Sequence, residues 1–234
     1  MKRKAYYAVL FGATYYAAGY ALSHKNCLII DRGINVGSEF FGECDLSGAA
    51  PASKFGKELV RIAKDNSVVD YFSMQGALAK LLSDAGVDIL LETTALGAYT
   101  KPNSDVITLY DNNGNFDIHA SRVIDTTTLG TLNYLANESL RNQLCKGEQP
   151  IVKYICATTK SGFIKMPVPL DMSFDRAATA LADALPEGEQ IAAINDRFIY
   201  DFAESYSFSG YNYTHIPSAQ FSCGIDAFEA GVKA

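Results

Sequence analysis

The stretch 5–33, AYYAVLFGATYYAAGYALSHKNCLIIDRG, decides the fold of this chain. Its first apolar run, Tyr6–Phe11, is typical of a buried strand, and the small residues of 15–23 are typical of a helix. A second apolar strand, Cys27–Ile30, ends at Asp31. A strand, a glycine turn, a helix and a second strand closed by an acidic residue together predict a βαβ unit of the dinucleotide-binding type.

The turn and the acid have the spacing of a dinucleotide site, but the glycines are incomplete. Asp31 lies 19 residues after Gly12, near the separation of about 20 found for ribose-binding acids. Glycine lets the strand turn sharply, and the helix N-terminus that follows faces a pyrophosphate. Where the fingerprint has Gly-x-Gly-x-x-Gly, this chain has Gly12-Ala13-Thr14-Tyr15-Tyr16-Ala17. The architecture is therefore better supported than the ligand.

Composition narrows the class of protein. The chain has 234 residues, of which 48% are hydrophobic and 20% charged, and this suits one large α/β domain, alone or with a small insert. The net charge of −6 predicts no nucleic-acid partner and no anionic membrane partner, because both need a cationic surface. We also find no apolar stretch long enough for a transmembrane helix.

The cysteines and histidines predict neither a metal site nor disulfides. The five cysteines are widely spaced and form no C-x-x-C pair, and the three histidines are scattered. This usage favours a reducing, cytoplasmic setting. The basic start Lys2–Lys4, ahead of an apolar run, mimics a secretory signal, but the run resolves into the strand, turn and helix described above.

Beyond residue 33 the sequence predicts alternating helices and strands. A polar loop over 34–51 is longer than the usual connection, which is typical of functional loops. The dipeptide Asn113-Gly114 predicts a hairpin turn, and 208–220 reads as an aromatic loop. We expect helices over 53–65, 71–85, 175–185 and 222–234, a helical connection over 131–149, and strands over 86–91, 106–110, 116–120, 121–125, 151–158, 163–168 and 191–201.

Four segments in this order resemble the FAD-dependent oxidoreductases of the glutathione-reductase-like flavoprotein superfamily, especially the family near the fumarate reductase flavoproteins. They are the opening βαβ unit with Asp31-Arg32-Gly33, the helix–glycine–strand segment 77–90, the segment Val123-Ile124-Asp125-Thr126-Thr127-Thr128-Leu129-Gly130, and the closing segment 223–231. The resemblance implies an α/β, Rossmann-like FAD-binding domain over 1–145 and 205–234. It also implies a small β-rich or α+β substrate or cap insert over 146–204.

The resemblance also implies a set of FAD-binding residues. Asp31 would bind the adenosine ribose, the backbone at Ala95 would meet adenine, and the helix beginning near Gly224 would face the flavin pyrimidine ring. Tyr15 and Tyr16 could stack on the cofactor or hydrogen-bond to it, or one could pack in the core and the other lie on the surface. The full implied set is Gly12, Ala13, Thr14, Tyr15, Tyr16, Asp31, Arg32, Ala95, Thr127, Gly130, Gly224 and Ile225.

Three departures from the family leave the occupancy of this site open. Thr14, Ala17 and Thr128 stand where the family has glycine, although the Thr14 hydroxyl could itself bond a phosphate. The chain then either binds FAD in an adjusted pose, and transfers a hydride between a small organic substrate and flavin, or has lost FAD and acts as a binding or subunit protein. A third alternative is an NAD(P)-binding enzyme, against which stands the absence of a Tyr-x-x-x-Lys pair.

Other reactive side chains predict less. Cys44 lies in the long loop, but no cationic neighbour lowers its pKa, so an unreactive thiol is favoured. His215 is the histidine best placed to act as an acid or base, although a surface or packing role is favoured. Lys165 and Arg197 could hold an anionic substrate, although solvated charges are the default. Because the insert is short for the family that the chain resembles, we expect the substrate site to be open or completed by a partner subunit, in a homo-oligomer or with another chain.

Overall fold

The computed structural model describes residues 5–37, 39, 51–64, 71–101, 104–134, 151–159, 163–194, 198–207 and 212–234. Its helices are α1 (Tyr15–Ser23), α2 (Lys54–Lys64), α3 (Tyr71–Asp84), α5 (Phe174–Asp183) and α6 (Gly224–Lys233), with 3-10 turns η1 (Thr131–Tyr134) and η2 (Ser218–Gln220). Its strands are β1 (Ala5–Phe11), β2 (Cys27–Ile30), β3 (Asp88–Leu90), β4 (Thr94–Lys101), β5 (Ser104–Asp111), β6 (Gly114–Asp125), β7 (Ile151–Thr159), β8 (Phe163–Val168), β9 (Ile191–Ile194), β10 (Ile199–Phe202), β11 (Tyr206–Ser207) and β12 (Tyr213–His215).

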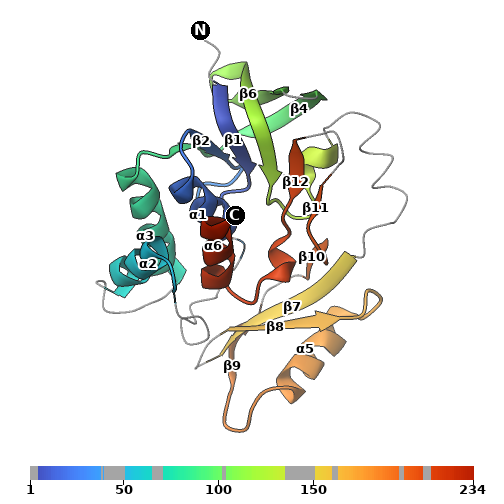
Figure 1. The fold of residues 1–234 in the computed structure, drawn as a ribbon. Coiled ribbons are helices and arrows are strands. Elements are labelled where there is room, and N and C mark those ends of the chain that lie inside the picture. The colour runs from blue at the N-terminus through green and yellow to red at the C-terminus, as the bar shows by residue number, and fades with distance from the viewer. Residues whose placement is uncertain are drawn as a thin grey trace.

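A large sheet organises the upper part of the molecule (Figure 1). Its strand order is β11-β12-β6-β1-β2-β3, and β4 and β5 form a meander that joins it at β6. β1 lies parallel to both β2 and β6, β2 to β3, and β6 to β12. The carboxyl ends of these five strands therefore meet at one edge, which is where ligands bind in open α/β sheets.

β1 is buried on both faces, as a central parallel strand must be. Ala8 and Leu10 pack under α1, α3 and α6 in one hydrophobic cluster. Val9 and Phe11 point to the other face, where the meander supplies partners such as Ile107. The alternation follows the two-residue period of a strand.

The crossing of α1 and α6 depends on two glycines. A Cβ on Gly19 would lie 2.1 Å from the carbonyl oxygen of Phe228, and one on Gly231 would lie 2.1 Å from that of Tyr16. The two helix backbones therefore touch, and α6, from the end of the chain, lies directly beside the first helix (Figure 1).

A second, smaller sheet lies below the first (Figure 1). β7 pairs antiparallel with β8 on one side, and with β9 and β10 on the other. α5 covers this sheet, and its Ala177 and Leu181 pack against Ile155 and Val168 in a core of their own.

The architecture confirms the predicted α/β, Rossmann-like fold, with three corrections. The strand expected over 191–201 is two strands, β9 and β10, with 195–197 outside the described residues. β6 is one strand of 12 residues where two were expected. β12 lies in the segment expected to be loop, and because it is three residues long it has no readable periodicity. Within the described residues, no helix is both long and apolar enough to cross a membrane.

Candidate functional site

The turn after β1 needs glycine at its first position. Gly12 has a φ of +93°, a region that side chains other than glycine rarely adopt. A Cβ there would also lie 2.6 Å from the Thr126 hydroxyl oxygen. The first fingerprint glycine is therefore fixed by both conformation and space.

Thr14 caps the helix at the position where the fingerprint has its second glycine. Its hydroxyl oxygen accepts from the backbone N–H of Ala17 at 3.2 Å, and the hydroxyl donates to Thr126 Oγ1 at 2.9 Å. Thr126 in turn donates to the carbonyl oxygen of Phe11 at 2.8 Å. The Thr14 side chain is buried, so it turns into the protein and serves as an N-cap.

Asp31 lies beside this turn, as the βαβ pattern predicts. Its Oδ2 accepts from the backbone N–H of Ala13 at 2.7 Å, and its Oδ1 accepts from that of Gly33 at 2.6 Å. Arg32 is exposed next to it. The backbone N–H of Thr93 donates to the Asp31 carbonyl oxygen at 3.0 Å, and this brings the start of β4, with the half-buried Ala95, close to the same acid.

Glu39, from the 34–51 segment predicted to be a functional loop, lies at the N-terminus of α1, although no motif singled it out. The backbone N–H of Tyr15 donates to Glu39 Oε1 at 2.5 Å. Burial raises the pKa of Glu39 to about 8, an effect that the hydrogen bond from Tyr15 opposes and the charge of Asp31 reinforces. Among the described residues, nothing hydrogen-bonds to its buried Oε2.

Tyr15 and Tyr16 are both buried, so the alternative that one lies on the surface is wrong. A Cβ on Gly37 would lie 2.9 Å from the Tyr15 ring, and one on Gly224 would lie 3.1 Å from it. The ring thus fills the space between the loop after β2 and the start of α6. Tyr16 stacks on Phe221 with ring centroids 5.8 Å apart.

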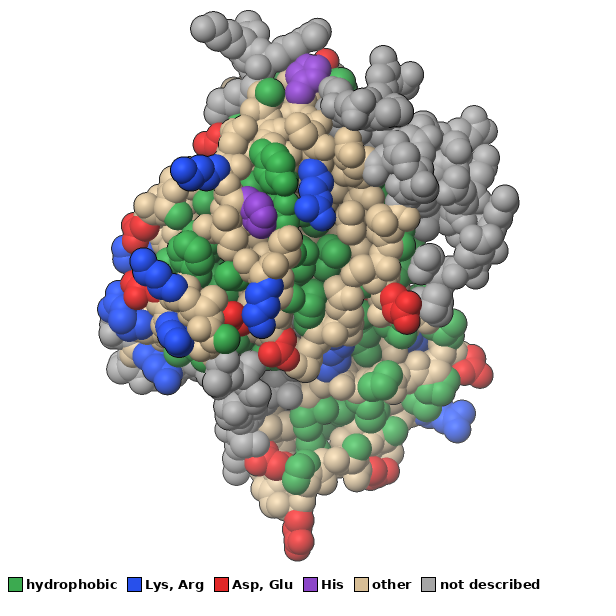
Figure 2. Space-filling view, in the orientation of Figure 1, with side chains coloured by type: hydrophobic (Ala, Val, Ile, Leu, Met, Phe, Trp, Pro, Cys, Tyr) green, Lys and Arg blue, Asp and Glu red, His purple; other side chains and the backbone are tan. Residues whose placement is uncertain are grey.

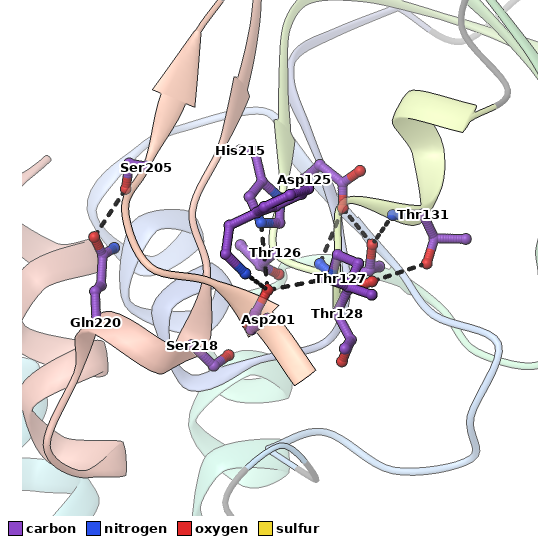
Figure 3. Close-up of polar contacts among 12 residues, drawn as sticks. Asp125, Thr126, Thr127, Thr128, Thr131, Asp201, Ser205, His215, Ser218 and Gln220 are labelled. Atoms are coloured by element: carbon purple, nitrogen blue, oxygen red, sulfur yellow. Dashed lines mark hydrogen bonds and ion pairs between the residues drawn. The ribbon is translucent and has the colours of Figure 1, made fainter. Parts of the chain in front are cut away.

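Asp125 organises the second turn at this edge, after β6 (Figure 3). It is fully buried, and it accepts from the backbone N–H of Thr127 at 2.9 Å, from that of Leu132 at 3.0 Å and from the hydroxyl of Tyr213 at 2.9 Å. Burial raises the pKa of Asp125, although the nearby His215 and the hydrogen bonds from Thr127 and Tyr213 oppose the rise. The carboxyl group therefore holds the 126–130 turn in shape.

His215 is fully buried beside that turn (Figure 3). Its Nε2 lies 3.6 Å from Asp201 Oδ1, and Asp201 Oδ1 also accepts from the backbone N–H of Leu129 at 3.1 Å. Asp201 belongs to β10, so it links the small sheet to the turn after β6. This interior position rules out the surface role and leaves packing, of the two roles favoured from sequence.

The remaining candidate residues lie in different environments. Gly130 has a φ of +62°, and a Cβ there would lie 2.7 Å from the Tyr206 hydroxyl. Ile225 is buried in the first turn of α6. Lys165 donates to three backbone carbonyls and is not a solvated charge. Cys44 and Arg197 lie outside the described residues.

Cations gather far from this edge, over α2 and α3 at the left of Figure 2. A surface depression of about 800 Å³ lies there, lined by Lys54, Phe55, Lys57, Glu58, Arg61 and Leu81. None of these residues belongs to the turns after β1, β2 or β6. The depression is therefore separate from the candidate nucleotide site.

No protein-family model and no curated protein matches this sequence. Solved structures nevertheless resemble its fold. A geranylgeranyl bacteriochlorophyll reductase-like protein from Thermoplasma acidophilum has a TM-score of 0.59 at 12% identity, over 98% of this chain and 77% of that one. A flavoprotein/dehydrogenase from Cytophaga hutchinsonii has a TM-score of 0.56 at 12% identity, over 98% and 76%.

The anhydrotetracycline hydroxylase OxyS from Streptomyces rimosus is similar at a TM-score of 0.51 and 9% identity, and the alignment covers 98% of this chain. This chain spans 60% of the hydroxylase's length. At such identities the likenesses show the fold alone. They support a flavoprotein-type fold in general, and they do not single out the glutathione-reductase-like family.

Proposed function

We propose that this chain binds FAD along the carboxyl edge of the large sheet and works as a flavin-dependent oxidoreductase on a small organic substrate. The observation that carries the proposal is the hydrogen bond from the Ala13 N–H to the Asp31 carboxylate, at 2.7 Å. It holds the acid after β2 beside the turn that opens α1, the two places where dinucleotide-binding folds hold the ribose and the pyrophosphate. The fold shared with a solved flavoprotein supports the same proposal.

The residues at this edge fit the two ends of such a cofactor. The oxygens of Asp31 keep lone pairs beyond those used by Ala13 and Gly33, so the carboxylate can also accept from a ribose hydroxyl. Tyr15, the first residue of α1, packs its ring against Gly224 at the start of α6, and amides at helix N-termini favour anionic or electron-rich groups. The other residues of the proposed site are Gly12, Thr14, Tyr16, Arg32, Ala95, Thr127, Gly130 and Ile225.

In this proposal a bound flavin supplies the hydride chemistry, and the chain supplies binding and orientation. Asp31 fixes the ribose. The positive end of the α1 dipole balances part of the diphosphate charge. The buried Tyr15 ring keeps water out of the space between the two helix N-termini.

A second candidate function is that of a non-catalytic subunit that keeps the fold without the flavin. Glu39 favours it, because its carboxyl group already accepts from the Tyr15 N–H at the N-terminus of α1. A diphosphate would need that same end of the helix. In this alternative the chain's own acid permanently takes the place of the phosphate.

Titration of the purified protein with FAD tests the proposal. We expect uptake of FAD, seen as a protein-bound absorbance band near roughly 450 nm, as for a protein whose chemistry is carried by flavin. Asp31→Asn should weaken binding by about tenfold, since it removes an acceptor from the ribose and about 1.4 kcal/mol corresponds to that factor. Asp84→Asn is the matched control, because Asp84 is exposed and pairs only locally, with Lys80.

The same titration distinguishes the alternatives. If neither the wild type nor Glu39→Gln takes up FAD, the subunit role replaces the enzyme. Preferred binding of NADPH would instead favour the NAD(P)-dependent alternative. Far-UV circular dichroism of each variant establishes that a loss of binding is not a loss of fold.

A further inference from the structure

A lysine of the small sheet binds the segment that connects β12 of the large sheet to α6. Lys165, on β8, donates from its Nζ to the carbonyl oxygens of Ser218 at 3.3 Å, Ala219 at 3.0 Å and Phe221 at 3.1 Å. Its ammonium also lies 4.6 Å from the centroid of the Tyr154 ring. An ammonium has three N–H donors, so these three carbonyls match its full donor capacity.

The carbonyls that Lys165 holds belong to the segment leading into α6. They lie in η2 and at Phe221, two residues before Cys223, which is the N-cap of α6. The Phe221 ring stacks on Tyr16 of α1. Gly224, three residues later, packs against the Tyr15 ring. The position of this segment therefore sets where the N-terminus of α6 meets that of α1.

We infer that Lys165 is a positioning residue, through which the small sheet fixes the start of α6 and so sets the affinity of the cofactor site. The inference rests on the proposed function, because it concerns the same site. Lys165 acts through the backbone of 218–221, whose carbonyl groups accept from its ammonium. By thermodynamic linkage, a cofactor bound at the site should in turn tighten the docking of the small sheet.

Lys153 offers a matched control within the same sheet. It is a buried lysine on β7 that donates from its Nζ to the carbonyl oxygens of Leu170, at 3.0 Å, and Met172, at 2.6 Å. Its ammonium lies 3.8 Å from the centroid of the Phe198 ring. Lys153 thus makes the same kinds of contact as Lys165, but to the small sheet's own segments.

The experiment compares Lys165→Met with Lys153→Met, because methionine keeps the apolar stem and removes the ammonium. We expect Lys165→Met to raise the Kd for FAD by about tenfold, as when a positioning contact from a charged donor is lost. Lys153→Met should leave the Kd within about twofold, since this variant perturbs only the small sheet. Lys165→Arg should restore part of the affinity, because its guanidinium also donates to carbonyls.

A second readout does not depend on FAD. In the cofactor-free protein, Lys165→Met should speed hydrogen exchange of the backbone amides of 222–228, whereas Lys153→Met should not. Unchanged exchange and unchanged FAD affinity in Lys165→Met would overturn the inference. Equal losses in the two variants would also overturn it, because general weakening of the small sheet would then be the cause.

The two readouts separate this inference from the proposed function. If the wild type does not bind FAD, the proposed function fails, and the exchange measurement still decides whether Lys165 positions α6. If the wild type binds FAD and Lys165→Met binds it equally well, only the positioning role fails. Circular dichroism of each variant excludes a global loss of structure.

Discussion

At the carboxyl edge of the large sheet, two side chains bind the N-terminus of α1, and one of them stands where the dinucleotide fingerprint has glycine. Thr14 uses its hydroxyl as the N-cap of α1 and as a donor to Thr126. It therefore adds a buried hydrogen-bonded contact where a glycine would leave open backbone. Glu39 is the more telling residue, because its carboxyl group is buried and holds an amide at the N-terminus of α1.

Glu39→Gln should change how stability depends on pH. Burial raises the pKa of Glu39 from 4.5 in the unfolded chain to about 8, so between these values the folded state holds the proton more tightly. Wild-type stability therefore falls as pH rises from about 4.5 to about 8. The glutamine cannot ionise and keeps an acceptor for the Tyr15 N–H, so the variant should gain up to about 5 kcal/mol over the wild type by pH 9, at about 1.4 kcal/mol for each unit by which the pKa is raised.

Thermal unfolding of both proteins between pH 5 and pH 9 measures this effect. Glu58→Gln is the control, because Glu58 is exposed and pairs with Arg61, which lowers its pKa. That control should show no gain at high pH. A Glu39→Gln variant whose stability stays parallel to the wild type across this range would contradict the prediction.

Among the elements, the pair α1 and α6 depends most strictly on residue size. The carbonyl groups of Phe228 and Tyr16 approach Gly19 and Gly231, respectively, so closely that no side chain fits at either glycine. Because α1 and α6 lie far apart in the sequence, this contact holds together two distant segments that pack on the large sheet. The start of α6, and with it the candidate flavin end of the site, follows from that contact.

Gly19→Ala should destabilise the protein by about 3 kcal/mol or more, because its Cβ would meet backbone atoms that cannot move aside. Alanine is otherwise the better helix former by about 1 kcal/mol. Gly76→Ala provides the control, since Gly76 is an exposed helical glycine with nothing within 4 Å of an added Cβ. We expect thermal unfolding to show a loss for the first variant and a small gain for the second.

In the whole molecule, polar groups join the two sheets. Asp201 on β10 accepts from the N–H of Leu129, a residue held at a φ of +57° in the turn after β6. Lys165 on β8 holds the segment before α6. The small sheet thus contacts two of the loops that surround the candidate site, and it does so through backbone groups, where geometry is specific.

Asp201→Ala should cost about 1–3 kcal/mol of stability, because it leaves the Leu129 N–H without its acceptor in a buried place. It also removes the support for an unfavourable backbone conformation. Asp171→Ala, at an exposed position, should change stability by no more than about 0.5 kcal/mol. Denaturant titration of the two variants makes the comparison. Equal unfolding midpoints would contradict a stabilising contact between Asp201 and Leu129.

The sequence by itself determined the βαβ unit, the helix–glycine–strand segment 77–90, the hairpin at Asn113-Gly114 and the placement of Asp31 beside the turn. These features are local, since periodicity and turn chemistry act over a few residues. Only the tertiary structure decided that Glu39 accepts from the Tyr15 N–H and that Gly19 packs against the backbone of α6. It also decided that Asp201 holds the turn after β6 and that Lys165 holds the segment before α6. Each of these contacts joins residues far apart in the chain or without a local pattern, so packing alone brings them together.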